Sequence, residues 1–306
     1  MITVSAPGKL MLMGEHAVVY GHPCLVTAVG RRLTLSIEKA DNSKLTINSP
    51  DTPDTRFVEK ALEVGCESWK IKHHGLHLVT QSSFSGKYGF GSSAAVVVAT
   101  LQALAVLFGR QPTKRQIFDL AYQVILAVQG IGSGFDVAAV IFGGTLYFVT
   151  GGKVIENLNS QELLPLVVGY TGIKSSSVNF IKQVAQKKQK YSQRVERIFQ
   201  AIRKLVDQAK TALVTSDWGK LGKLMDFNQE YLRDLGVSSP KLEELILAAK
   251  KAGAWGAKLS GAGGGDCMIA LARGDKREAI SKAIRGAGGE VVNIRPDAPG
   301  VRLEKI

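Results

Sequence analysis

The sequence has few of the features that mark secreted, metal-stapled or membrane-spanning chains. It has only three cysteines in 306 residues, and their number is odd and none shares C-x-x-C spacing. A disulfide framework or a zinc site is therefore not expected, and a reducing cytoplasm fits. The longest apolar run, residues 94–108, has two polar interruptions and is shorter than a bilayer span, so it predicts a buried helix.

Acidic residues and leader-like features are also scarce. The chain has 26 Asp and Glu against 39 Lys and Arg, a formal net charge of +13, and its N-terminus shows no secretory signal pattern. The charge allows three interpretations: a nucleic-acid partner, a small anionic substrate, or a basic surface without a specific role. In the densest basic segment, 182–210, apolar residues recur at helical spacing and aromatic residues are not interleaved with the basic ones. This pattern predicts one long amphipathic helix with solvated lysines, so we expect neither nucleic acid nor membrane as a partner.

The length and composition fit a globular chain of two domains. Hydrophobic residues make up 45% and charged residues 21% of the sequence. Helical and strand patterns alternate in both halves, which favours an α+β or α/β class, and we place the domains at 1–162 and 163–306. The patterns predict helices at 56–71, 94–108, 113–128, 178–212, 218–235, 240–252 and 276–287, and strands at 76–82, 144–149, 164–170, 257–260, 266–272 and 290–294.

A first glycine-rich loop, KYGFGSSAA, leads into the apolar helix and has no acid near the helix start. A helix N-terminus carries about half a positive charge and free N–H donors, and glycines let phosphate oxygens reach them. Ser92 or Ser93 supplies a hydroxyl suited to magnesium. The alternative is a tight turn with a serine cap. No G-x-x-x-x-G-K-[ST] string occurs, and residues 109–115 lack the acid that a dinucleotide fingerprint requires.

Two further loops carry dense glycine. QGIGSGFDVAA, residues 129–139, ends on a single carboxylate, Asp136, which could accept a proton from a substrate hydroxyl or cap the chain from Val137 onward as an Asx turn. KLSGAGGGDCMIA, residues 258–270, joins two predicted strands and suggests either close approach to a ligand or a hairpin bulge. In SAPGKLMLMGEH, Lys9 is a candidate cation for a phosphate or a catalytic carboxylate, and otherwise a surface lysine.

Taken in order, these four elements resemble the superfamily of galactokinase, homoserine kinase, mevalonate kinase and phosphomevalonate kinase, known as the GHMP kinases. The resemblance runs from Ser5 to about Ala272. It implies an α+β fold of two domains, the first related to ribosomal S5 domain 2 and the second ferredoxin-like, with the active site between them. It also implies ATP and magnesium as cofactors, a small anionic substrate as partner, and a monomer or homodimer.

Carried over by matching motifs, the resemblance implies a role for each loop. Asp136 would be the catalytic carboxylate, Lys9 would orient it, and Ser93 would bind magnesium. The residues implied to bind the ATP phosphates are Lys87, Gly89, Gly91, Ser92, Ser93 and Ala94. The residues implied to bind the substrate are Glu15, His16, Ser133, Gly134, Ser175, Gly263 and Gly264.

The motifs resemble two members of the family that differ in their phosphoryl acceptor. MGEHAVVYGHP resembles mevalonate kinases, whereas the three glycine-rich loops resemble phosphomevalonate kinases more. Mevalonate kinases usually carry a magnesium-binding glutamate eleven residues before the catalytic aspartate, and Ile125 stands there in this chain. We therefore expect 5-phosphomevalonate as the acceptor, with Lys87 and Lys174 near its phosphate, and mevalonate as the alternative. A remote alternative is a non-catalytic sensor, which would not need Lys9, Ser93 and Asp136 together.

Overall fold

Two long strands open the chain and form the floor of the first domain. The computed structural model describes residues 1–40, 44–50 and 54–304. β1 (Ile2–Met13) and β2 (Pro23–Lys39) pair antiparallel, and the register shifts between Pro7 and Gly8, just before Lys9. A bulge of this kind re-aims the side chains that follow it. The other strands of this sheet are β3 (Leu45–Asn48), β4 (Leu76–Ser82), β5 (Thr145–Val149), β6 (Val154–Leu158) and β11 (Arg302–Leu303).

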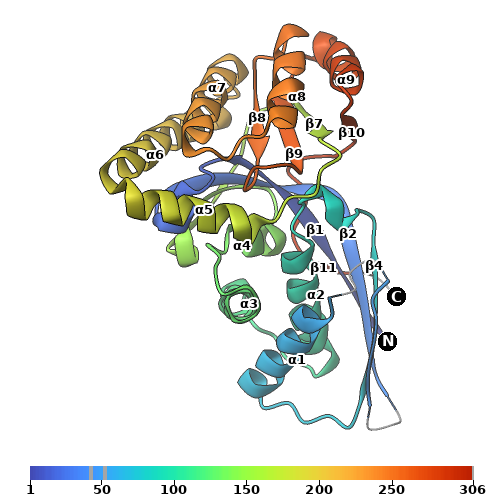
Figure 1. Ribbon diagram of the computed structural model, residues 1–306. Coiled ribbons are helices and arrows are strands. Elements are labelled where there is room, and N and C mark those ends of the chain that lie inside the picture. Colours follow the sequence, from blue (N-terminus) through green and yellow to red (C-terminus); the bar gives the residue numbers. More distant parts are fainter. Residues whose placement is uncertain (41–43, 51–53, 305–306) are drawn as a thin grey trace.

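Helices cover one side of this sheet, and α2 (Ser92–Leu107) lies innermost among them (Figure 1). Its residues are apolar on every side, and it packs against β1, β2 and three neighbouring helices. The prediction of a buried helix is therefore confirmed, and its N-terminus is fixed in the interior. Its helical neighbours are α1 (Arg56–Trp69), α3 (Lys114–Gln129) and α4 (Phe135–Phe142).

The second domain is built on a four-stranded antiparallel sheet with the order β10-β7-β9-β8. This order and the helices between the strands match the ferredoxin-like topology, so the expected α+β class is confirmed. Its strands are β7 (Leu166–Tyr170), β8 (Gly256–Ser260), β9 (Cys267–Leu271) and β10 (Glu290–Val292). Its helices are α5 (Ser177–Lys190), α6 (Ser192–Val214), α7 (Trp218–Leu235), α8 (Pro240–Lys251) and α9 (Arg277–Gly286), and α5 lies along the boundary with the first domain (Figure 1).

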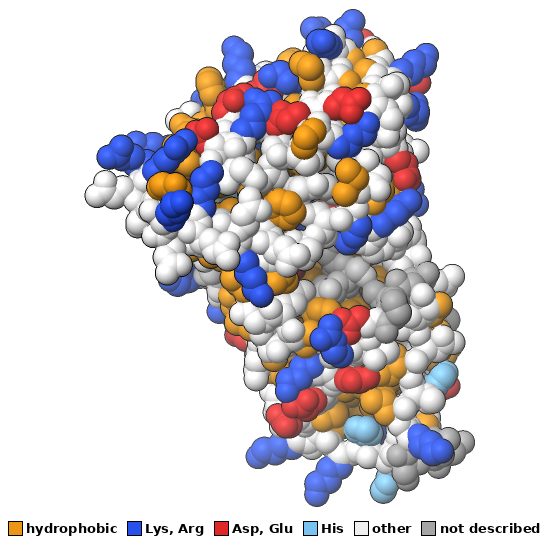
Figure 2. Space-filling model, in the orientation of Figure 1, with side chains coloured by type: hydrophobic (Ala, Val, Ile, Leu, Met, Phe, Trp, Pro, Cys, Tyr) orange, Lys and Arg blue, Asp and Glu red, His pale blue; other side chains and the backbone are white. Residues whose placement is uncertain are grey.

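The basic segment predicted as one helix is two helices. Tyr191 has φ −131° and ψ 52°, outside the helical region, and separates α5 from α6. The apolar stripe that predicted a buried face belongs to α6, whereas α5 buries only Val184 fully. On the face turned to the viewer in Figure 2, the described Lys and Arg side chains are spread over both domains with Asp and Glu among them. None of the helices in the described residues is long and apolar enough to cross a membrane.

The end of the described chain returns to the first domain. β11 pairs with β1, and the Arg32 guanidinium donates hydrogen bonds to the carbonyl oxygens of Pro299 and Gly300. The described chain therefore begins and ends beside the first domain (Figure 1). The boundary between 162 and 163 separates the two sheets except for this returning segment, and it stays a prediction as a domain limit.

The close packing of this returning segment can be tested at two glycines. Both have positive φ, 68° at Gly143 and 70° at Gly151, but a Cβ at Gly143 would overlap the Gly300 nitrogen, whereas no atom lies within 4 Å of one at Gly151. We expect Gly151→Ala to lower the free energy of unfolding by about 1–2 kcal/mol through the left-handed backbone alone. Gly143→Ala should cost clearly more in urea unfolding, because it adds the overlap with Gly300 to a backbone conformation, φ 68° and ψ −171°, that is essentially restricted to glycine. Equal losses would mean that residues 296–304 do not pack as described.

Candidate active site

The Lys9 side chain joins two of the glycine-rich loops. Its ammonium donates a hydrogen bond of 2.9 Å to the Gly89 carbonyl in the first loop and lies 5.2 Å from the ring centroid of Phe135, which begins α4 after the second loop. Lys9 is only 8% exposed. Burial lowers the pKa of its amine, and the nearby carboxylates of Asp136 and Asp266 oppose that shift. Lys9 is thus a buried cation between two loops and not a surface lysine.

The first loop needs glycine because other groups approach its backbone closely. Gly89 has φ 71° and Gly91 has φ 79°, so both adopt the left-handed conformation. A Cβ at Gly91 would come within 3.0 Å of the Lys9 side chain, and one at Gly89 within 2.6 Å of the Asp266 carboxylate. Gly91 caps α2, whose first turn holds Ser92 and Ser93 and no acid. The backbone N–H groups of this first turn lie beside the buried Lys9 ammonium, and together they form a site suited to an anion.

The second loop presents Asp136 at the start of α4. Gly134 caps this helix with φ 88°, and Tyr122 of α3 supports the loop by donating a 2.9 Å hydrogen bond to the Gly132 carbonyl. The half-buried Asp136 carboxylate accepts a hydrogen bond from the Val137 N–H. Asp136 lies inside α4 and Gly134 is its cap, so the alternative of an Asx turn that caps the chain from Val137 onward is wrong. The hydroxyl of Ser133 is buried without a hydrogen-bond partner. Sequence patterns did not predict α4, because its eight residues are too uniformly apolar to show a helical stripe.

The turn after β1 places His16 in an unusual backbone conformation. His16 has φ 61° and ψ −48°, and the Ala17 N–H donates to the Glu15 carbonyl at 2.7 Å, which defines a γ-turn of the rare, strained kind. Its Nε2–H donates to the Ala262 carbonyl of the third loop at 2.9 Å. Burial lowers the pKa of the imidazole to about 4, so His16 is neutral near pH 7.

His16 and Glu15 line a small cavity between the domains. The first domain contributes Lys9 and Phe135 to its wall, and the second contributes Ser177 and Ile181 of α5 together with Gly261 and Ala262. The structure therefore gathers Lys9, Glu15 and His16 around one space, and their roles toward a substrate stay predictions. Besides these three and Ser177, its lining is apolar.

The third loop packs tightly against the protein itself. A Cβ at Gly263 would overlap the Val237 carbonyl, and one at Gly264 would overlap the Phe180 ring of α5. Ser175 is drawn into the same loop: its hydroxyl donates to the Gly263 carbonyl at 2.5 Å and its N–H donates to Asp266 at 2.9 Å. These glycines are required by packing, and their contact with a substrate stays a prediction.

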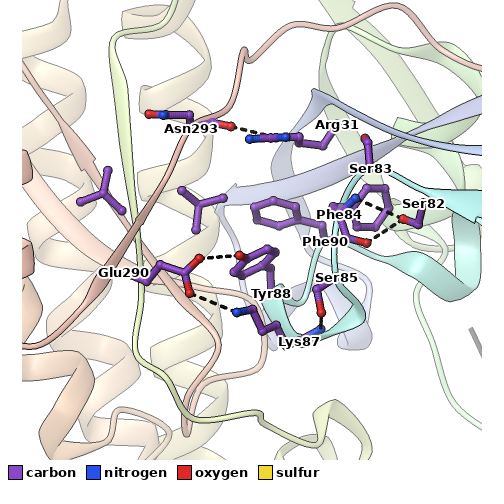
Figure 3. A pocket seen from close by; sticks show the side chains of 12 residues that line it. Arg31, Ser82, Ser83, Phe84, Ser85, Lys87, Tyr88, Phe90, Glu290 and Asn293 are labelled. Atoms are coloured by element: carbon purple, nitrogen blue, oxygen red, sulfur yellow. Dashed lines mark hydrogen bonds and ion pairs between the residues drawn. The ribbon is translucent and has the colours of Figure 1, made fainter. Parts of the chain in front are cut away.

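Lys87 lies on the other side of the first loop, in a hollow of about 610 Å³ (Figure 3). Its ammonium pairs with Glu290 of β10 at 3.1 Å, and the Tyr88 hydroxyl donates to the same carboxylate at 2.5 Å. Figure 3 shows Lys87 and Tyr88 pointing together toward Glu290. The ammonium is therefore committed to an ion pair between the domains, and nucleotide contact by Lys87 stays a prediction.

Two charged residues at the site were not among the predicted ones. Asp266 pairs with Lys174 at 3.4 Å and faces the first loop, and Lys258 of β8 is completely buried. Both lie in the third glycine-rich segment, 258–270. Its glycines predict close approach of another group, but the pattern gives no signal for the charged residues on either side of them. Among the described residues, no cluster of three or more His, Cys, Asp or Glu side chains suits a metal ion.

Comparison with known proteins agrees with this arrangement. The family model for the GHMP kinases N terminal domain matches residues 56–144, and the model for GHMP kinases C terminal matches residues 209–290. The chain belongs to the GHMP kinase family. It is accordingly an ATP-dependent phosphotransferase, and the resemblance seen in its motifs is confirmed.

Curated relatives span the whole chain. Mevalonate kinases of Pyrococcus abyssi and Pyrococcus horikoshii are 36% and 37% identical, each over 100% of this chain and 98% of the relative. The crystal structure of L. major mevalonate kinase in complex with R-mevalonate has a TM-score of 0.83 at 28% identity, covering 96% of this chain and 95% of that one. Streptococcus pneumoniae phosphomevalonate kinase in complex with phosphomevalonate and AMPPNP also gives 0.83, covering 97% of this chain and all of that one, but at 21% identity it shows the fold alone.

The buried His16 predicts a specific acid sensitivity. Its folded pKa of about 4 lies below the ordinary value of 6.5, so the unfolded chain binds the proton more readily between these values. Stability should therefore fall as pH drops through this window, by about 2.5 kcal/mol at pH 4.5 from this group alone.

We expect His16→Gln to lose correspondingly less stability than the wild type between pH 7.5 and pH 4.5 in urea unfolding. His74→Gln, at an exposed histidine, serves as the matched control and should follow the wild type. If His16→Gln loses as much stability as the wild type over this pH range, the imidazole is not buried in the neutral form.

Proposed function

We propose that the protein transfers the γ-phosphoryl group of ATP to the 5-hydroxyl of mevalonate. The proposal depends most on one observation: the buried Lys9 ammonium joins the cap of α2 to the loop that presents Asp136. The curated relatives named mevalonate kinases, which cover the whole chain, support the acceptor.

The carboxylate of Asp136 acts on the acceptor. The hydroxyl oxygen attacks the γ-phosphorus, the bond from that phosphorus to the β–γ bridging oxygen breaks, and ADP leaves. Asp136 accepts the hydroxyl proton as the new bond forms. Lys9 interacts electrostatically with this carboxylate and offsets charge on the transferred group, which is the main demand of phosphoryl transfer.

The start of α2 binds the phosphates. Gly89 and Gly91 leave the backbone N–H groups of the first helical turn uncovered, and Lys9 adds the buried positive charge that the triphosphate requires. The donors of this region also fit magnesium, because the Ser93 hydroxyl and the Asp136 carboxylate offer the oxygen ligands it prefers. Bound there with the nucleotide, magnesium would neutralise phosphate charge.

The cavity supports mevalonate over its phosphate ester. A phosphate monoester adds about 1.5 to 2 negative charges near the reacting centre. The cavity wall supplies one ammonium, that of Lys9, beside the Glu15 carboxyl, the neutral His16, Ser177 and apolar residues. Burying that extra charge without a further cation is unfavourable. The relatives and the cavity thus reverse the ranking of acceptors that the sequence motifs favoured.

Phosphomevalonate remains the second candidate because of two residues. Ile125 stands in place of a metal-binding glutamate and is buried on α3. Its side chain would lie 3.4 Å from a Cβ on Gly132, so the second loop packs against an apolar side chain there. Lys174 lies at the site through its 3.4 Å ion pair with Asp266, and its side chain is half exposed. If released from that pair, it would supply the missing cation for a second phosphate.

The role of Asp136 predicts a rate defect without a binding defect. Asp136→Asn removes the proton acceptor while keeping the side-chain volume, so kcat should fall by about 10²- to 10⁴-fold. The ATP dissociation constant, measured by calorimetry, should change by no more than a few-fold. The control is Asp119→Asn, at an exposed ion pair with Arg115. Turnover near that of the control would remove Asp136 from the reacting centre.

The acceptor is decided by kinetics with both compounds in parallel. We expect kcat/KM for R-mevalonate, followed by ADP release at saturating ATP and magnesium, to exceed that for 5-phosphomevalonate by at least about 100-fold. Such a ratio corresponds to roughly 3 kcal/mol of transition-state discrimination. The reverse ratio would assign phosphomevalonate as the acceptor and leave the kinase chemistry intact.

A further inference from the structure

A completely buried ion pair crosses the boundary between the domains. Lys258, in the middle of β8, donates a hydrogen bond to a carboxylate oxygen of Glu15, in the turn after β1. The two side chains are 0% and 1% exposed. The second carboxylate oxygen of Glu15 is buried without a hydrogen-bond partner, although Glu15 lines the cavity between the domains. The pair therefore connects the second domain directly to the wall of this cavity, which is called the acceptor cavity because the acceptor is proposed to bind there.

Packing alone does not explain a lysine at this position. Every residue of β8 is buried, and an apolar side chain of similar size would fill the same space without the loss of hydration that a buried charge suffers. Burial lowers the pKa of the Lys258 amine and raises the pKa of the Glu15 carboxyl, and their mutual attraction opposes both shifts. Buried ion pairs are weak contributors to stability and are better explained by the specific geometry that they fix.

The geometry in question is the strained turn at His16. A residue in such a backbone conformation costs about 1–3 kcal/mol and persists only where its surroundings hold it in place. Here Thr150 of the first domain contacts the Val18 carbonyl, and several further holding contacts come from the second domain. Besides Lys258, the Asn228 side chain accepts a hydrogen bond from the Gly14 N–H at 3.3 Å, and the Ser260 hydroxyl donates to the Met11 carbonyl at 2.8 Å.

We propose that Lys258 is a positioning residue, which holds Glu15 and thereby the γ-turn that directs His16 into the acceptor cavity. The acceptor half of the site is then complete only when the second domain is docked on the first. The nucleotide half, formed by Lys9 and the cap of α2, does not depend on this pair. The inference rests on the proposed function in one respect, that the acceptor binds in this cavity.

Lys258→Met tests the proposal, because it keeps the volume of the side chain and removes its charge. With the better acceptor of the wild type, KM for that acceptor should rise at least about tenfold, whereas KM for ATP should stay within about twofold. The His16 imidazole, followed by proton NMR and assigned by its loss in His16→Gln, should move its pKa from about 4 toward its ordinary value as the turn relaxes. Lys250→Met is the matched control, since Lys250 pairs with Asp226 at 2.8 Å within the second domain and away from the turn.

A second variant separates positioning from stability. The unpaired Glu15 charge in Lys258→Met could unfold the protein, and the double variant Glu15→Gln with Lys258→Met removes both charges and should restore thermal stability. We expect this double variant to keep the raised acceptor KM and the shifted His16 pKa. Wild-type values of both quantities in either folded variant would overturn the proposal. Failure of the proposed function would instead appear in the wild type, as a different preferred acceptor, and would leave the His16 titration unaffected.

Discussion

The burial of the Lys9 ammonium is the constraint on which the rest of the site depends. A buried cation must be compensated, and the described partners of Lys9 are one carbonyl, an aromatic ring face and carboxylates at longer range. These partners come from the three glycine-rich segments, with Gly89 in the first, Phe135 and Asp136 in the second and Asp266 in the third. The position of Lys9 after the bulge in β1 therefore determines how these segments face one another. The same incomplete compensation leaves the interior suited to a further negative charge, and the phosphates of ATP supply that charge in the proposed reaction.

Glycine serves two purposes around this cation, and the structure separates them. At Gly91 the missing side chain lets the Lys9 chain pass beside the start of α2, which leaves the N–H groups of the helix uncovered. At Gly263 and Gly264 the missing side chain lets the third loop pack against Val237 and against Phe180 of α5. Dense glycine in the sequence indicates close approach in both cases. Only the neighbours, which belong to distant parts of the chain, decide whether the approaching group is a ligand or the protein.

How much the sequence could predict follows from the range of the interactions involved. The bounds of α7 and β4 agree with their predicted ranges, because a helical apolar stripe and a strand alternation are properties of neighbouring residues. The break at Tyr191 interrupts a continuous helical pattern, and the described contacts of Tyr191 do not explain it. The return of β11 to β1 depends on contacts across the fold, and no local pattern encodes it. For the same reason Lys9 and Asp136 could be chosen by their motifs, whereas the interdomain role of Lys258 became visible only when β8 met the turn after β1.

Two buried lysines, one from each domain, divide the chemistry of the site. Lys9 belongs to the first domain and lies beside the cap of α2 and Asp136, where the proposed phosphoryl transfer takes place. Lys258 belongs to the second domain and pairs with Glu15, in the turn that lines the cavity proposed for the acceptor. Because these two sets of contacts share only the cavity between them, changes in the turn can alter the acceptor without disturbing phosphate binding. A fold organised in this way can retain one phosphoryl-transfer apparatus while its acceptor changes, so the glycine-rich loops alone do not determine the acceptor.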